Sequence, residues 1–147
     1  MEQVKISQHT AILLEHARKS GIGQTELLQA VKSKDLSAFA AAEEEHYAYG
    51  ELFTYAEQHG EQLEQAVLEG YRITFNTRNG LKIWLEEAFH LHSETDFEVG
   101  DGRIEGVRLT EEQYAKLQNS LAANWAIAET KEIPSGIEVT LSIRALL

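Results

Sequence analysis

Apolar residues in the first half of the chain recur at the three- and four-residue intervals of an amphipathic helix. The first such stretch covers residues 7–20, and Gly21 follows it as a plausible terminating residue. Its apolar stripe consists of Ile6, Thr10, Leu13, Leu14 and Ala17. A shorter helix is predicted over 24–33, and a last one over 61–69, which ends at Gly70.

A longer helix is expected between these two, with Asp35 as its N-terminal cap. One seam of side chains follows it at helical spacing: Phe39, Ala42, His46, Tyr49, Phe53 and Ala56. Gly50 can break this helix in two, because glycine costs about 1 kcal/mol relative to alanine inside a helix. Gly60 is expected to end it.

The pattern changes at residue 71. Tyr71, Ile73 and Phe75 alternate with polar residues, which is typical of a strand, and Asn79-Gly80 follows as a strong hairpin signal. Residues 81–89, however, match the spacing of an amphipathic helix at every apolar position, and as a strand they would have no clean face. The pattern therefore favours strand, loop and helix over a hairpin, with Asn79 able to cap the helix.

The remaining segments are predicted from their turns and alternation. A short strand around Phe97 and Val99 turns at 100–102 into a strand over 103–109, in which Gly106 is expected to form a bulge. Thr110 then caps a helix, and a strand runs from Trp125 to about residue 132. A turn at 133–136 leads into a strictly alternating strand over 137–144.

These elements predict an α+β protein: a helical region over 1–69, followed by an antiparallel-rich sheet domain with two helices over 70–147. The second part has the order β-α-β-β-α-β-β, in which the first six elements follow a ferredoxin-like split βαβ unit. This fold carries many unrelated functions, so the order alone implies none of them.

Composition excludes several kinds of chemistry. The chain has no cysteine, which removes disulfides, thiol nucleophiles and iron–sulfur ligation and favours a cytoplasmic location. The first ten residues hold no apolar run typical of a signal peptide, and no apolar stretch approaches the length of a membrane span. The net charge is −11, with 24 acidic and 13 basic residues, so nucleic acids and anionic membranes are unfavourable partners.

Two groups of histidines and carboxylates are weak candidates for metal ligands. Glu43 and His46 lie three residues apart and can meet on one helix face, as in ferritin-like bundles, but the second Glu-x-x-His that those sites need is missing. Glu86, His90 and His92 form the other group. We expect neither group to bind a metal: His46 fits an apolar seam, and His90 and His92 fit the C-terminal end of a helix. No cofactor is expected.

A helix-turn-helix reading is the alternative for the first half, with residues 24–33 and 36–49 as its helices. Its cationic face would consist of Arg18, Lys19, Lys32 and Lys34. The run Glu43-Glu44-Glu45 on the second helix opposes DNA binding, because it would place three carboxylates near phosphates.

Catalytic motifs are missing from the sequence. It contains no Gly-x-Ser-x-Gly elbow, no phosphate-binding loop and no dinucleotide-binding glycine pattern. We therefore expect a non-catalytic cytosolic protein that acts by binding another protein, with an immunity-type antagonist of a basic toxin as one example. A helix-turn-helix regulator is the second hypothesis, and a small metal-dependent enzyme is the third.

Overall fold

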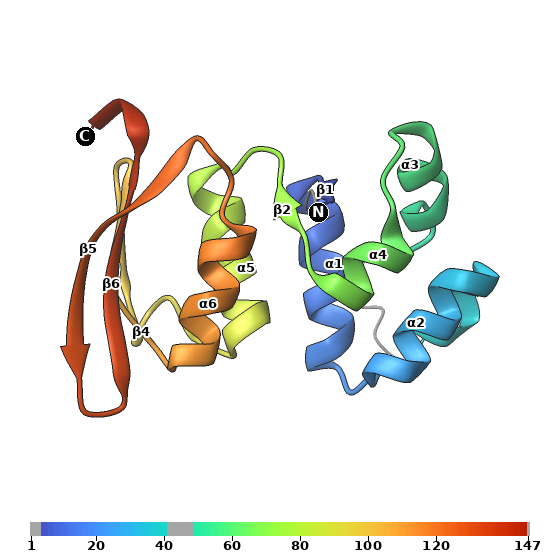
Figure 1. Ribbon diagram of the computed structural model, residues 1–147, viewed down its shortest axis with the longest axis horizontal. Coiled ribbons are helices and arrows are strands. Elements are labelled where there is room, and N and C mark those ends of the chain that lie inside the picture. The colour runs from blue at the N-terminus through green and yellow to red at the C-terminus, as the bar shows by residue number, and fades with distance from the viewer. Residues whose placement is uncertain (1–3, 41–48, 147) are drawn as a thin grey trace.

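The computed structural model describes residues 4–40 and 49–146 and has an α+β architecture. Figure 1 shows three layers side by side: the sheet, then α5 and α6, then α1 with the other N-terminal helices beyond it. The elements of the first half are β1 (Lys5–Ile6), α1 (Gln8–Lys19), α2 (Gln24–Ser33), the 3₁₀ turn η1 (Leu36–Phe39), α3 (Leu52–Gln58) and α4 (Leu63–Glu69).

The helices α1 and α2 form where the sequence predicts them. The Ser7 hydroxyl accepts a hydrogen bond from the Thr10 backbone N–H at the start of α1. Gly21 follows the helix with φ 105°, a conformation that glycine adopts without strain. The α2 bounds, Gln24–Ser33, match the predicted range.

The third predicted helix is only partly visible. The Asp35 carboxylate caps η1 by accepting from the Ser37 backbone N–H, and α3 follows Gly50. The centre of the predicted helix, with Ala42 and His46, lies outside the described residues. Phe39 and Tyr49 pack as stacked rings with centroids 4.9 Å apart, so both ends of the segment reach the same core.

The strand predicted to begin at residue 71 is shorter than expected, and it pairs outside the large sheet. It is β2 (Arg72–Ile73), which pairs in parallel with β1 and does not join the larger sheet. The pairing is made by the Arg72 N–H on the Val4 carbonyl and the Thr74 N–H on the Ile6 carbonyl. Phe75, which was predicted to belong to this strand, follows its end and is 59% exposed. The predicted element order is correct, but a ferredoxin-like sheet with this strand inside it is not formed.

The helix predicted over residues 81–89 is present as α5 (Arg78–Phe89), which begins earlier than predicted. Asn79 is not its cap. Thr77 takes that position, with its hydroxyl accepting from the Gly80 N–H, and Asn79 lies in the first turn. Leu81, Trp84 and Leu85 are fully buried.

The four-stranded sheet has the order β3-β4-β6-β5, with every neighbouring pair antiparallel. Its strands are β3 (Glu98–Gly100), β4 (Arg103–Leu109), β5 (Trp125–Ile133) and β6 (Gly136–Ile143), and η2 (Arg144–Leu146) follows. The β4–β6 register shifts between Ile104 and Val107, where Gly106 has φ 75°, so the predicted bulge is present. Between β4 and β5 lies α6 (Glu111–Ser120), which opens with the predicted Thr110 cap.

One core cluster of buried residues draws members from both halves of the chain. Trp84 and Trp125, its largest members, are at most 1% exposed, and α1 packs against α5. The division into domains 1–69 and 70–147 stays a prediction. Within the described ranges, no helix has the length and apolar character that crossing a membrane requires.

The buried Asn76 links the segment between β2 and α5 to the start of β5 through hydrogen bonds. The Asn76 side chain accepts from the Ala122 N–H and donates to the Gln8 side chain. The backbone carbonyl of Asn76 accepts from the Asn124 side chain and from the Trp125 indole N–H. Because Asn76 is 1% exposed, each of these bonds satisfies a polar group that water cannot reach.

Candidate functional site

The structure does not bring the second predicted group of metal ligands together. The Glu86 carboxylate accepts a hydrogen bond from the Ser93 backbone N–H, and His90 takes a left-handed conformation at the exposed C-terminal end of α5. The His92 N–H donates to Asp96 in the following turn. Within residues 4–40 and 49–146, no three His, Asp or Glu side chains are placed to hold a metal ion. The other pair, Glu43 and His46, lies outside the described residues.

The four cations of the DNA-binding alternative lie on α1 and at the end of α2, and three of them contact carboxylates. Arg18 contacts Glu15 at 3.0 Å, Lys19 contacts Glu87 at 3.5 Å, and Lys34 contacts Glu57 at 3.8 Å. Lys32 is exposed. These contacts reduce the positive charge that this face can offer to a phosphate.

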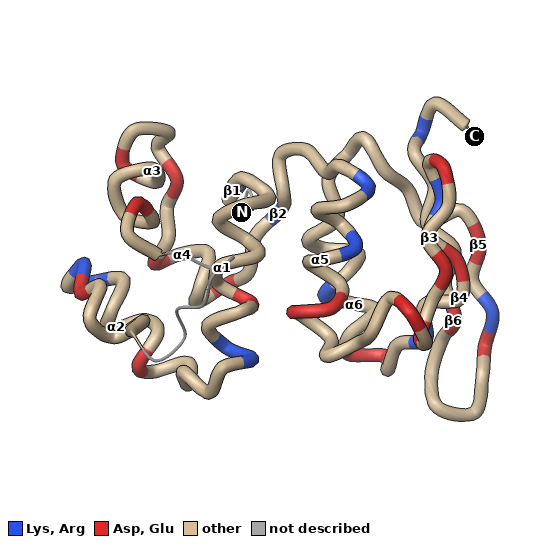
Figure 2. The backbone as a smooth tube through the Cα atoms, turned by 180° about the vertical axis from the view of Figure 1, so that it is seen from behind, with Lys and Arg blue, Asp and Glu red and all other residues tan. Residues whose placement is uncertain are grey.

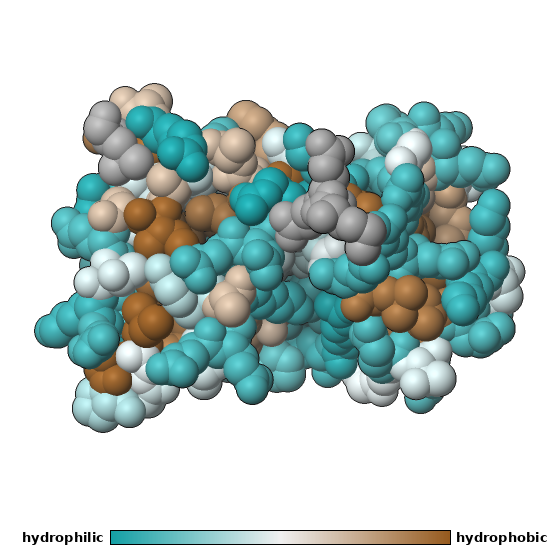
Figure 3. All heavy atoms as spheres, in the orientation of Figure 1, coloured by the Kyte–Doolittle hydropathy of each residue, from teal (hydrophilic) through white to brown (hydrophobic). Residues whose placement is uncertain are grey.

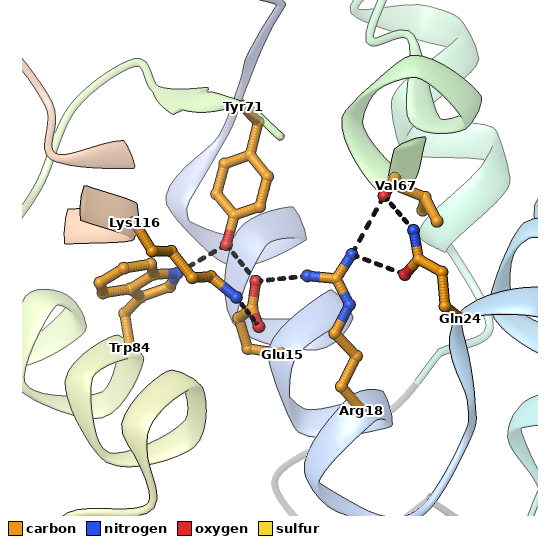
Figure 4. Close-up of polar contacts among 7 residues, drawn as sticks. All are labelled: Glu15, Arg18, Gln24, Val67, Tyr71, Trp84 and Lys116. Carbon is orange, nitrogen blue, oxygen red and sulfur yellow. Dashed lines mark hydrogen bonds and ion pairs between the residues drawn. The ribbon is translucent and has the colours of Figure 1, made fainter. Parts of the chain in front are cut away.

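A buried carboxylate at the centre of the molecule receives three side-chain donors (Figure 4). Glu15 on α1 is 2% exposed, and it accepts from Arg18 at 3.0 Å, from Lys116 of α6 at 2.6 Å and from the Tyr71 hydroxyl at 2.5 Å. The same hydroxyl accepts from the Trp84 indole N–H. This ionic cluster joins α1, α5, α6 and the residue that precedes β2.

The cluster shifts the pKa values of its two acids in opposite directions. Burial alone would raise the pKa of Glu15, but Lys116 and Arg18 stabilise its charged form more strongly, so this pKa lies below its usual range. Burial and the neighbouring Glu15 charge raise the pKa of Tyr71 well above its usual value. Glu15 is therefore charged and Tyr71 neutral at physiological pH, so the cluster holds the helices in place and offers no proton for exchange near neutrality.

A second buried pair lies between α1 and α5. The His16 Nδ1 lies 3.1 Å from the Glu87 carboxylate, which also contacts Lys19, and the His16 ring stacks on Tyr49 with centroids 6.3 Å apart. Glu15 and His16 are adjacent in sequence and point to different neighbours, Lys116 of α6 and Glu87 of α5. Sequence patterns could not find these partners, because Glu15 and Lys116 are 101 positions apart.

A candidate for binding is an apolar groove on the helical half. Its volume is about 550 Å³, and it lies between α2, α3 and α4. Its apolar lining consists of Val31, Phe53, Ala56, Leu63 and Leu68. Leu68 is 58% exposed, although its neighbour Val67 is buried, because Leu68 lies off the inward face of α4.

The rim of this groove is acidic. Among the residues that the structure describes, Glu57, Glu61 and Glu64 line it together with Lys34, which contacts Glu57. Glu61 also accepts from the Ser7 N–H and the Thr10 hydroxyl, so its carboxylate fixes the wall of the groove to the start of α1. Figure 3 shows apolar atoms exposed on this half and bordered by hydrophilic ones.

Sequence reasoning missed this groove. The residues that line it belong to three helices whose packing a single sequence does not specify, and Leu68 reads as one more apolar residue of an amphipathic helix. The nearest signal is that Leu63, Ala66 and Val67 already form the inward face of α4 at helical spacing, which leaves Leu68 beside that face.

Comparison with known proteins adds no relative: no protein-family model, curated protein or solved structure matches this chain significantly. The geometry of the groove, its charge and the surrounding fold are therefore the basis for a functional proposal.

Proposed function

We propose that this protein acts by binding a partner protein, and that it holds a basic amphipathic helix of that partner in the groove between α2, α3 and α4. The observation that carries the proposal is the combination of an apolar floor with an acidic rim. A cytosolic antagonist that masks a basic toxin or another basic effector belongs to this class.

The walls of the groove favour a helical occupant. An extended peptide is usually bound by adding a strand to an open sheet edge, and this groove is bordered by helices whose backbone hydrogen bonds are internal. Recognition must then come from side chains. An amphipathic helix places apolar side chains at i, i+3, i+4 and i+7, which is a row that fits between neighbouring helices.

Apolar burial supports binding energetically. Full burial of a leucine side chain is worth roughly 1.5–3 kcal/mol, and more than half of Leu68 is available for contact. Phe53, which is half-buried at the same site, adds an aromatic surface.

The negative charge around the groove favours a positively charged partner. Three carboxylates and one lysine surround the opening, and the whole chain carries −11. Figure 2 shows acidic positions on both the helical half and the sheet. This field attracts a cationic segment over a distance and increases its rate of association, most strongly at low ionic strength.

Fluorescence anisotropy with synthetic peptides tests the proposal. The probe is a labelled helix of leucine and lysine with leucines at helical spacing; its controls are a leucine–glutamate twin and a leucine–lysine peptide of the same composition in scrambled order. We expect the wild-type protein to bind the first peptide and neither control, because both the apolar row and the positive charge are needed.

Two pairs of variants locate the binding. Leu68→Ser should weaken binding of the probe roughly tenfold, whereas Leu146→Ser, which changes an equally exposed leucine after the sheet, should leave it unchanged. Glu64→Lys should weaken binding and Glu98→Lys should not, since Glu98 is exposed on β3. If Leu68→Ser binds as tightly as the wild type, or the scrambled peptide binds equally well, the groove is not the site.

A further inference from the structure

The sheet has one long open edge. In the order β3-β4-β6-β5, β5 is the last strand, and among the residues described here no strand pairs with its outer side. It has nine residues, a length of about 30 Å at roughly 3.4 Å per residue. Such an edge presents backbone N–H and C=O groups that another strand can pair with.

Charged side chains form an ordered row across the outer face of the sheet. Arg108 on β4 is opposite Glu138 on β6, with 3.5 Å between their charged groups, and Glu138 is in turn opposite Lys131 on β5. Side chains directly opposite each other in a sheet share a face. The row therefore alternates in sign and ends at the edge on the positive charge of Lys131.

A negative charge lies two residues away on the same face. Glu129 is opposite Thr140 of β6, and the regular register from Glu129 to Ile133 keeps Glu129 and Lys131 on one side of the strand. Both side chains are exposed. The edge strand thus carries a negative charge, Glu129, on one side of Thr130 and a positive charge, Lys131, on the other.

We propose that β5 pairs in antiparallel fashion with β5 of a second copy of this chain, with the two-fold axis at Thr130. In this register Glu129 is opposite the partner's Lys131, and the symmetry repeats the pair on the other side of the axis. The charge row then continues across the interface as Arg108, Glu138, Lys131 and the partner's Glu129. The two sheets become one sheet of eight strands, and this interface is independent of the groove on the helical half.

The charges also specify the register. A two-fold axis at Glu129 would place that residue opposite its own copy, and an axis at Lys131 would do the same with the lysine, so both neighbouring registers put like charges together. Beyond these pairs the regular pairing ends at the register shift between Ile127 and Glu129, because Ile127 is opposite the buried Leu141 of β6 and faces the core.

The same strand carries features that usually protect an edge. A lysine, and the register shift between Ile127 and Glu129, both discourage unselective pairing. In the Thr130 register Glu129 is opposite the lysine of the partner, which the two neighbouring registers do not allow. The register shift between Ile127 and Glu129 limits the pairing to a short segment. The expected dimer is therefore specific and weak, and it forms in the micromolar range.

Sedimentation velocity over a range of concentrations tests this interface with two single variants. Glu129→Lys places two lysines opposite each other at both symmetric positions, and Lys131→Glu does the same with glutamates. We expect each variant alone to self-associate roughly tenfold more weakly than the wild type. An equal mixture of the two variants should associate again, because the lysine introduced into one chain would then meet the glutamate introduced into the other.

The mixture separates edge pairing from a loss of folding, since two unfolded variants could not restore association. Leu68→Ser should dimerise like the wild type, which keeps this result distinct from the peptide experiment. A wild type that stays monomeric up to about 1 mM, single variants that associate as tightly as the wild type, or a mixture that associates no better than either variant would overturn the proposal.

Discussion

Glu15 is held between two cations and a phenol, and water reaches little of it. Its carboxylate is 2% exposed, while the side chains of Arg18 and Lys116 are 26% and 33% exposed. The cations can turn toward solvent if the carboxylate is lost, but the buried Tyr71 hydroxyl cannot. The balance of these effects decides how much the ionic cluster stabilises the fold.

Replacing Glu15 with glutamine should destabilise the protein by about 2–4 kcal/mol, because the amide keeps the shape and removes the charge that both cations need. Lys116→Met is the matched control. It should cost about 1 kcal/mol, since Glu15 retains Arg18 and Tyr71 as donors. Urea unfolding measures both values, and a Glu15→Gln protein as stable as the wild type would show that the cluster contributes no net stability.

The stabilisation from Glu15 should disappear in acid. Its pKa is lower in the folded protein than the value of 4.5 expected without structure, so its contribution is complete above about pH 5 and is lost as the pH falls through the lowered pKa. The difference in unfolding free energy between the wild type and Glu15→Gln should therefore be constant from about pH 5 to 8 and shrink below about pH 4. A difference that stays constant through the acid range would argue against a charged Glu15.

At the scale of elements, local spacing predicted the helices and strands well where one face carries a clear pattern. The bounds of α2 and β4 match the predicted ranges, and Thr110 caps α6 as expected. Periodicity also resolved residues 81–89 correctly as a helix, despite the preceding Asn79-Gly80.

The predictions were wrong where contacts with residues distant in the sequence determine the local structure. Residues 71–76 alternate like a strand of the sheet, but only 72–73 pair, and their partner is β1 near the N-terminus. Thr77 and Asn79 are both good caps, and Gln8, which accepts from the Thr77 N–H, fixes the start of the helix at Thr77. The groove and the ionic cluster depend on contacts of this distant kind, so neither could be predicted.

The turn between β5 and β6 should not tolerate a side chain at Gly136. This residue has φ 149°, and a Cβ there would overlap the carbonyl oxygen of Leu109, which is backbone and cannot move without disturbing the β4–β6 pairing. Gly136→Ala should cost about 2–4 kcal/mol in urea unfolding.

Gly100→Ala is the matched control for this turn, because a Cβ at Gly100 meets only the Arg103 carbonyl oxygen, at an ordinary 3.9 Å. It should stay within about 1 kcal/mol of the wild type. Equal losses at the two glycines would mean that the close approach of β4 does not limit position 136.

For the whole molecule, negative charge should prevent tight binding to nucleic acids. The chain carries −11, and three of the four cations in the best candidate patch contact carboxylates. We expect weak or undetectable binding to random duplex DNA at near-physiological salt, measured by fluorescence anisotropy. Micromolar binding that is lost in a Lys32→Glu and Lys34→Glu double variant would favour the helix-turn-helix alternative instead.

The most direct test of the groove as a binding site is a map of contacts by NMR. Isotope-labelled protein is titrated with the leucine–lysine peptide, and changes in backbone amide signals are followed residue by residue. The account predicts that the largest changes cluster on α2, α3 and α4 around Val31, Phe53 and Leu68, and that the sheet is little affected. Changes centred on the sheet, or spread evenly over the acidic surface, would contradict binding in the groove.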